Sequence, residues 1–301
     1  MAMLASMLAF VSLIGADEPP DPVAMVLAVQ GAVKLSRMDL LRSGDEVAVP
    51  TPGSVQVLFL RDGHKETLKP GFTVRITDTG GTPADAVDRD KTVLPKTQLK
   101  GLRSLAASAR AGVTRVRDIG TPPLPVSPMN TATVLSDRPT FVWTKRADAG
   151  EYELQLFLGD SVRTEPPLWS ERSNKQELAF PKGRQGLKRG ETYTWRVLDR
   201  AKNLVAQGTL TVATKKQAHD FESVQKLADS KEVTDTLLAA MLFEGGQFYD
   251  ESNRLFESLA KKMPDEPWVL LARARHLALR GRNDEAASLE KKARAIADKM
   301  R

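Results

Sequence analysis

The sequence predicts a multi-domain α+β protein, in which two all-β modules precede an α-helical repeat segment. Short apolar runs alternate with turn residues over residues 23–95 and again over residues 127–214, a pattern typical of small β domains. From residue 219 to residue 301 the apolar residues recur at helical spacing instead. The chain has 301 residues, a length that suits two or three modules better than one.

Residues 1–16 have the composition of a secretory signal peptide. An apolar run from Met3 to Gly15 is followed by Ala16 and by an acidic, proline-rich stretch. The run is shorter than the roughly 20 residues needed to cross a bilayer, but it fits the apolar core of a signal peptide. We therefore expect export, with cleavage near Ala16. Because no Lys or Arg precedes the run, the alternatives are a buried N-terminal helix and a misassigned start codon.

The first β module, residues 23–95, is predicted from alternation and turns. Between Ser54 and Leu60 the alternation places Val55, Val57 and Phe59 on one face of a strand. An Asp-Gly pair then follows at residues 62 and 63, and such a pair supplies the positive φ that a tight hairpin needs. Repeated strands and turns of this kind predict a small sandwich or barrel.

Residues 77–91 lack periodicity and are rich in Gly and Asp, so the sequence predicts a loop or linker there. Four carboxylates gather in it, and they have two interpretations. They either solvate the linker or offer oxygen ligands to calcium, although their spacing is not that of an EF-hand loop. These residues are Asp78, Asp85, Asp88 and Asp90.

Residues 96–126 are predicted to form a basic helix and a proline-rich linker. Leu99, Leu102 and Leu105 stand at helical spacing, and prolines follow Gly120. The helix either packs its leucines on a β domain or presents its charges to an anionic lipid or cell-wall polymer. It carries no stacking aromatic residue, which argues against binding of single-stranded nucleic acid. The candidate anionic-partner contacts are Lys96, Lys100, Arg103, Arg110, Arg115 and Arg117.

The second β module, residues 127–214, contains aromatic strands that predict a two-sheet sandwich. In one of these strands Tyr193, Trp195 and Val197 share a face. A tyrosine before a core strand of such a sandwich can anchor the corner through a bond from its hydroxyl to the backbone.

The helical segment, residues 219–301, repeats itself after 34 residues: Leu237 aligns with Leu271, and Ala240 aligns with Ala274. We expect the repeats to present a groove to a partner and to be dispensable for folding of the β modules, so that deletion of residues 234–301 leaves both folded. The residues predicted to form the helical core are Leu237, Leu238, Phe243, Leu255 and Leu271.

Three family resemblances attach to these segments. Residues 26–76 resemble a FecR-type β domain through Gly31-x-Val33, Leu41-x-x-Gly44-Asp45-x-Val47, Ser54-Val55-x-Val57, Asp62-Gly63, Leu68-x-x-Gly71 and Val74-x-Ile76. This resemblance implies a protein of the Gram-negative envelope, periplasmic or associated with the outer membrane, that takes part in protein or ligand recognition. The family's namesake transmits signals to an anti-sigma system, and this chain lacks its sigma-regulating N-terminal region and its transmembrane helix.

The other two resemblances concern the second β module and the helices. Residues 127–213 are similar to fibronectin type III or immunoglobulin-like modules, through Arg138-Pro139-x-Phe141-x-Trp143 and Leu187-x-x-Gly190-x-x-Tyr193-x-Trp195. The 34-residue repeat resembles tetratricopeptide repeats, which implies a surface for a partner peptide or helix.

The sequence contains few residues in patterns typical of catalysis. The chain has no cysteine, which excludes thiolate catalysis, disulfides and iron–sulfur clusters. Its histidines, His64, His219 and His276, lie far apart and outside any known metal-binding frame. Two S-x-x-K matches, at Ser223 and Ser288, lack the accompanying motifs of a serine–lysine enzyme. We therefore predict no catalytic, cofactor-binding or metal-ligating residue and no cofactor.

The preferred hypothesis is a non-enzymatic envelope scaffold or protein-interaction protein. Its expected partners are envelope proteins, with peptidoglycan or an anionic lipid surface as further candidates. We expect no nucleic-acid partner and no transmembrane segment. The alternative is a regulatory component of a FecR-type transmembrane signalling system, which would need a membrane-embedded partner. The net charge of +6 is compatible with either hypothesis.

Overall fold

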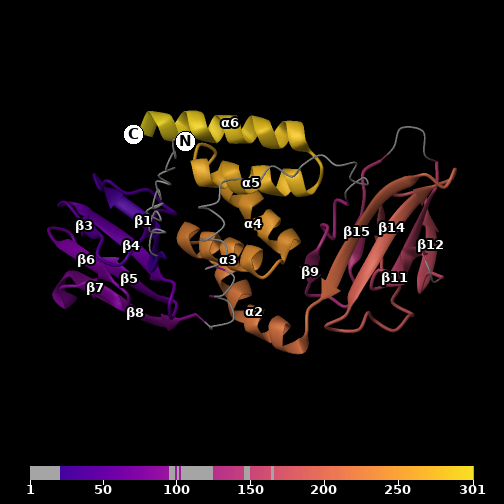
Figure 1. Cartoon of the computed structure of the whole chain (residues 1–301), viewed down its shortest axis with the longest axis horizontal. Coiled ribbons are helices and arrows are strands. Elements are labelled where there is room, and N and C mark those ends of the chain that lie inside the picture. The colour runs from indigo at the N-terminus through magenta and orange to yellow at the C-terminus, as the bar shows by residue number, and fades with distance from the viewer. Residues whose placement is uncertain are drawn as a thin grey trace, which may run out of the picture.

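The computed structural model describes residues 21–94, Leu99, Leu102, and residues 125–145, 150–163 and 166–300. The protein is a mixed α+β chain in which several β-sheets precede a C-terminal segment of five helices (Figure 1). We refer to residues 24–94 as the first β module, to residues 125–213 as the second β module and to residues 215–300 as the helical segment. The predicted order, β-sheets first and helices last, is confirmed.

The first β module contains two sheets. The five-stranded sheet has the order β2-β1-β4-β5-β8, and the three-stranded sheet has the order β3-β6-β7. As predicted, Val55, Val57 and Phe59 share one face, and all three are fully buried between the sheets. The strands are β1 (Ala24–Gly31), β2 (Leu40–Leu41), β3 (Glu46–Ala48), β4 (Gly53–Phe59), β5 (His64–Leu68), β6 (Thr73–Thr77), β7 (Gly80–Thr82) and β8 (Val87–Val93).

The prediction of a loop over residues 77–91 is wrong for most of that stretch, which forms β7 and β8. Strand β8 pairs with β5, where Leu68 faces Val87 and Glu66 faces Arg89. Pairing with a distant strand creates β8, so no apolar alternation marks it in the sequence. Two of its aspartates face lysines of the preceding segment, at 2.9 Å between Lys69 Nζ and Asp88 Oδ1.

The second β module also contains two sheets, with the orders β12-β11-β14-β15-β9 and β10-β13. Tyr193, Trp195 and Val197 share one face, as predicted, and are buried in its core. The hydroxyl of Tyr193 accepts a hydrogen bond of 2.8 Å from the backbone N–H of Lys188, the expected corner contact. The strands are β9 (Ala132–Val134), β10 (Thr140–Val142), β11 (Tyr152–Leu158), β12 (Trp169–Ser173), β13 (Glu177–Ala179), β14 (Thr192–Asp199) and β15 (Leu204–Val212).

The helical segment begins at Lys215, before the predicted residue 219, because Thr214 and Gln217 form a capping box. Of the predicted helical core, Leu237, Leu238, Phe243 and Leu255 are buried. Leu271 is 40% exposed, so its assignment to the core is wrong: the neighbouring helices cover Val269, Leu270 and Ala274 on other sides of the same helix. The helices are α2 (Lys215–Ala228), α3 (Val233–Gly245), α4 (Tyr249–Lys262), α5 (Pro267–Leu279) and α6 (Asn283–Met300).

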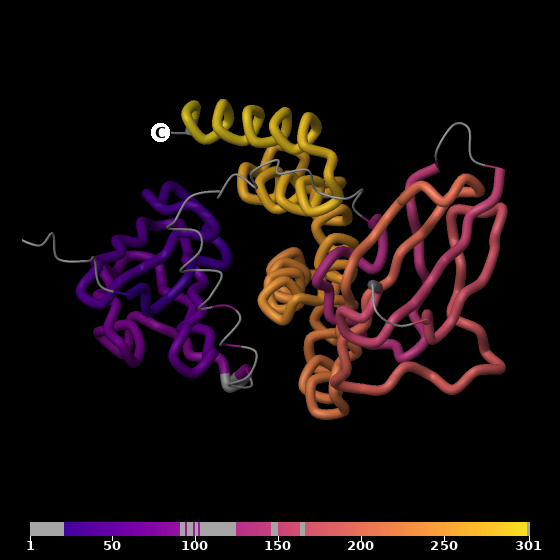
Figure 2. The backbone as a smooth tube through the Cα atoms, turned by 45° about the vertical axis from the view of Figure 1, so that its right-hand side comes forward, coloured from indigo at the N-terminus to yellow at the C-terminus, as the bar shows by residue number. Residues whose placement is uncertain are grey.

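Although last in sequence, the helical segment lies between the two β modules (Figures 1 and 2). Helix α3 packs on β1, and its residues 237–243 are all buried. The outward faces of β1 and β4 therefore belong to the same apolar cluster as α3. From the first β module this cluster takes Met25, Leu27, Leu58, Leu60 and Leu94, and from the helical segment it takes Leu237, Leu238, Met241, Leu242 and Phe243, among others.

Polar contacts reinforce both junctions of the helical segment. On the first β module, Lys65 Nζ lies 3.8 Å from Asp235 Oδ1 of α3. On the second, the backbone N–H of Thr133 donates to the carbonyl of Gln247 at 2.8 Å. The backbone N–H of Met129 donates to Asp250 Oδ2 at 3.2 Å. The helical segment is thus fixed to both β modules.

Candidate functional site

The basic stretch proposed for anionic partners falls largely outside the described residues. Lys96, Lys100, Arg103, Arg110, Arg115 and Arg117 all lie there, and their geometry is not part of the fold given above. Leu99 and Leu102 are described, and both are helical. Each is 1% exposed and belongs to the apolar cluster between the first β module and the helices. These two leucines therefore serve packing.

A buried polar cluster surrounds His64 in the first β module. Its Nδ1 lies 2.5 Å from Asp62 Oδ1 and its Nε2 lies 3.2 Å from Glu66 Oε1, while its ring stacks on Phe59. Glu66 is fully buried and also accepts two hydrogen bonds from the guanidinium of Arg89, at 2.9 and 2.6 Å. Burial raises the pKa of Asp62, but its hydrogen bonds from His64 outweigh burial and hold that pKa below its ordinary range.

The glycines of β7 make room for this cluster. The backbone N–H of Gly81 donates to Glu66 Oε2 at 2.7 Å. A Cβ on Gly81 would lie 2.7 Å from Val74 Cγ1 and 2.9 Å from Val87 Cγ1. The Gly-Gly pair at residues 80 and 81, read from sequence as part of a loop, is therefore a strand that closes over a buried carboxylate.

A second buried polar cluster joins three helices of the helical segment. Glu244 of α3 accepts hydrogen bonds at Oε2 from His276 Nε2 at 2.6 Å and from the hydroxyl of Ser252 at 3.0 Å. Its Oε1 lies 3.2 Å from Arg275 Nε. Burial raises the pKa of Glu244, but the bond from His276 and the charges of His276 and Arg275 outweigh it and lower that pKa below the ordinary value of 4.5.

Serine, histidine and glutamate thus meet in one place, but their order differs from that of a nucleophilic relay. In such a relay histidine stands between the hydroxyl and the carboxylate. Here Glu244 stands between Ser252 and His276, and the hydroxyl of Ser252 lies 3.0 Å from both Glu244 Oε2 and the carbonyl of Ala240, with no hydrogen bond to the imidazole. Ser252 is fully buried. This arrangement ties α3, α4 and α5 together.

The serines of the two S-x-x-K matches lie on different helices. Ser223 lies on α2, where its hydroxyl donates to the backbone carbonyl of Asp220 at 3.2 Å. Ser288 is exposed on α6, at the edge of a cleft described below. The two serines therefore occupy different helices and different surroundings.

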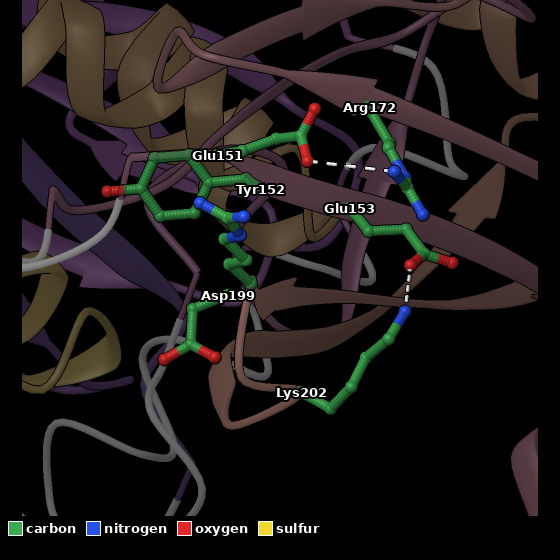
Figure 3. Close-up of a pocket in the computed structure, with 7 residues that line it drawn as sticks. Glu151, Tyr152, Glu153, Arg172, Asp199 and Lys202 are labelled. Atoms are coloured by element: carbon green, nitrogen blue, oxygen red, sulfur yellow. Dashed lines mark hydrogen bonds and ion pairs between the residues drawn. The ribbon is translucent and has the colours of Figure 1, made fainter.

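A polar cleft of about 300 Å³ opens at one end of the second β module (Figure 3). Its charged side chains are largely paired with one another: Arg172 NH1 lies 3.7 Å from Glu151 Oε2, and Lys202 contacts Glu153. The hydrogen bond from Lys202 is the main reason why the pKa of Glu153 is lowered to about 2. The cleft is lined by Glu151, Tyr152, Glu153, Arg172, Asp199, Arg200 and Lys202.

A second cleft, of about 240 Å³, lies among α4, α5 and α6. It differs from the first because apolar side chains line it together with charged ones. The sequence predicted that the repeats present a groove to a partner, but it did not identify this cleft, whose lining comes from separate helices. The lining residues are Asn253, Glu257, Arg273, Leu277, Arg282, Glu285, Ser288 and Leu289.

Within the described part of the chain, no group of three His, Cys, Asp or Glu side chains is arranged to hold a metal ion. No helix among the same residues is both long enough and apolar enough to span a membrane. No protein-family model matches the chain, and no curated protein matches it.

Proposed function

We propose that the protein is a non-enzymatic scaffold of the bacterial cell envelope that binds a protein partner through its helical segment. One observation carries the proposal: the helical segment is packed between two β modules and fixed to both. Two domains joined by a large apolar contact keep a fixed relation to each other, whereas small polar contacts permit motion.

The contact with the first β module is of the apolar kind. Met25, Leu27, Leu58 and Leu60 are each at most 2% exposed, and they share a core with α3. Burial of a leucine or methionine side chain contributes about 1.5–3 kcal/mol. Four such side chains are enough to keep the first β module docked. The expectation that this module folds without residues 234–301 stays a prediction, because its two sheets also enclose a separate buried core.

The chemistry of the two buried clusters also supports a scaffold. Both Glu66 and Glu244 have their charges compensated by neighbouring cations or donors within the fold. Neither is aimed at a cleft. In this proposal, the FecR-like and immunoglobulin-like characters of the β modules and the tetratricopeptide-like character of the helices serve recognition and spacing. The proposed location in the cell envelope rests on the apolar run of residues 1–16.

Crosslinking in cells tests the proposal. A tagged full-length chain would be crosslinked, recovered from the envelope fraction and analysed by mass spectrometry beside an unrelated tagged exported protein. We expect a specific envelope protein to be enriched in stoichiometric amounts. Recovery in the cytoplasm with residues 1–16 intact would contradict the location. Enrichment of only a receptor or an anti-sigma protein would favour the signalling alternative instead.

A further inference from the structure

The cleft among α4, α5 and α6 offers space on the helical segment for part of a ligand. Asn253 and Glu257 of α4 and Arg273 and Leu277 of α5 line it. From α6, Glu285, Ser288 and Leu289 line it too. Its volume of about 240 Å³ is near the lower end of ligand sites, which suits one or two side chains of a bound peptide. Helix α3, by contrast, is covered by the first β module.

Two arginines and two glutamates line the cleft, and both glutamates have partners other than Arg273. Glu257 accepts a hydrogen bond of 2.9 Å from Asn253 Nδ2 and lies 4.0 Å from Arg280 NH1. Glu285 accepts two hydrogen bonds from the guanidinium of Arg282, at 2.6 and 2.5 Å. Both carboxylates of the cleft therefore have cationic partners already.

Arg273 has no such partner among the described residues. It lines the cleft, is half-buried and forms no ion pair with any other described residue. A guanidinium presents a planar set of donors that matches a carboxylate in a two-bond contact, and partial burial strengthens such a contact. The group that best completes the cleft is thus an anionic carboxylate.

Apolar surface accompanies this cation. Leu277 and Leu289 are both half-buried and line the same cleft from α5 and α6. Asn253 is 8% exposed, and its side-chain carbonyl oxygen forms no hydrogen bond with another described residue. That oxygen is able to accept a backbone N–H of a bound peptide. Cation, apolar surface and amide together match a short peptide segment.

We propose that this cleft binds an acidic segment of a protein partner. A glutamate or aspartate carboxylate lies on Arg273, and a neighbouring apolar side chain lies on Leu277 and Leu289. This inference rests on the proposed function, because it names the chemistry by which the scaffold recognises its partner. It adds a site that the sequence did not predict.

A peptide-binding experiment tests the inference. The probe is a fluorescein-labelled hexapeptide of alternating leucine and glutamate, titrated with the full chain and followed by fluorescence anisotropy. The matched probe carries glutamine in place of glutamate. We expect the acidic probe to bind about tenfold more tightly, the ratio that corresponds to one charged contact, and to bind more weakly as salt is raised.

Variants assign the binding to the cleft. Arg273→Ala should weaken binding of the acidic probe by about tenfold, again the effect of one charged contact. Arg294→Ala is the matched control, because Arg294 is a 75% exposed arginine on α6 that does not line the cleft. Ser288→Glu places a like charge on the opposite wall at an exposed position and should also weaken binding.

Three results would overturn the inference: no binding of the acidic probe at millimolar concentration, equal binding of the two probes, or equal effects of Arg273→Ala and Arg294→Ala. Capture experiments with the same variants also distinguish failure of this inference from failure of the proposed function. If the wild-type chain captures an envelope partner and Arg273→Ala captures it equally well, the inference fails and the scaffold stands. If the wild-type chain captures none, the proposed function fails.

Discussion

His276 of α5 donates a hydrogen bond of 2.6 Å from Nε2 to Glu244 Oε2 of α3, so that two helices distant in sequence share one buried charge. His276 is 1% exposed and Glu244 is 7% exposed. Ser252 of α4 and Arg275 of α5 complete the set. In a low-dielectric interior each member depends on the others, because removal of one leaves a polar group without compensation.

Replacement of the central carboxylate should destabilise the protein. We expect Glu244→Gln to lower the free energy of unfolding at pH 7 by about 3 kcal/mol, because breaking a buried pair leaves its partner uncompensated. Urea unfolding followed by circular dichroism measures the effect. Glu285→Gln is the control, because Glu285 is 56% exposed and an exposed pair contributes only about 0–1 kcal/mol. Equal losses from both substitutions would contradict the role given to Glu244.

The same carboxylate should make stability depend on pH. The pKa of Glu244 in the folded protein lies below its ordinary value of 4.5, so its stabilisation is fully present above that value and is lost as pH falls through the folded-state pKa. Burial raises the pKa values of Asp250 and Glu251, which acts in the opposite direction. We therefore expect the gap in unfolding free energy between wild type and Glu244→Gln to narrow below pH 4.5. A constant gap down to pH 3 would contradict this prediction.

The junction between the first β module and the helices should be sensitive to truncation of one side chain. Leu58 is fully buried and belongs to the cluster shared with α3. We expect Leu58→Ala to cost about 2–5 kcal/mol, the range for a buried leucine. Leu158→Ala should be nearly neutral, because Leu158 is 44% exposed. Thermal unfolding of the two variants gives the comparison, and similar midpoints for both would argue against the shared core.

A methyl group on the strand that covers Glu66 should be poorly tolerated. The added Cβ of Gly81→Ala would press on Val74 and Val87, and overpacking of this kind costs about 1–3 kcal/mol. Gly183→Ala is the matched control, since a Cβ at Gly183 would have no neighbour within 4 Å. Denaturant unfolding of both variants measures the change in unfolding free energy. An unchanged stability of Gly81→Ala would mean that β7 can shift away from the cluster around Glu66.

The corner of the second β module offers a single-atom test. Tyr193→Phe removes the hydroxyl that accepts the N–H of Lys188 and leaves the buried ring in place. We expect a loss of about 1 kcal/mol, the usual net contribution of one hydrogen bond. Tyr249→Phe serves as a comparison, because that hydroxyl has no hydrogen bond with another described residue. The denaturant concentration at the unfolding midpoint should therefore fall more for Tyr193→Phe than for Tyr249→Phe.

Local patterns predicted the strands whose alternation is set by one buried face. Val55, Val57 and Phe59 are an example, as are Tyr193, Trp195 and Val197, because each set needs only its own strand to be recognised. Strand β8 escaped prediction because it pairs with β5 and its exposed positions are charged. Strand β7, which pairs with β6, escaped prediction because its Gly-Gly pair is typical of a loop. Leu271 was misassigned because repeat alignment matches positions without showing which side a neighbouring helix covers.

The sequence did contain an unused indication of the central helices. Leu58 and Leu60 make the end of the second face of β4 and its continuation apolar, which an open sheet face would not require. Residues 237–243 of α3 are apolar without interruption, a composition typical of a helix covered on all sides. Together these features indicate mutual burial. The cleft around Arg273 carried no comparable indication, because its residues come from three helices.

The central position of the helical segment also governs how the chain can fold. Helix α3 begins at Val233 and packs on β1, which ends at Gly31, so the part of the first β module under α3 stays uncovered until that helix has been made. Folding that depends on contacts between such distant residues is slow, and it leaves apolar surface open to aggregation in the meantime. A newly made chain of this protein should therefore be prone to aggregation until α3 covers the first β module.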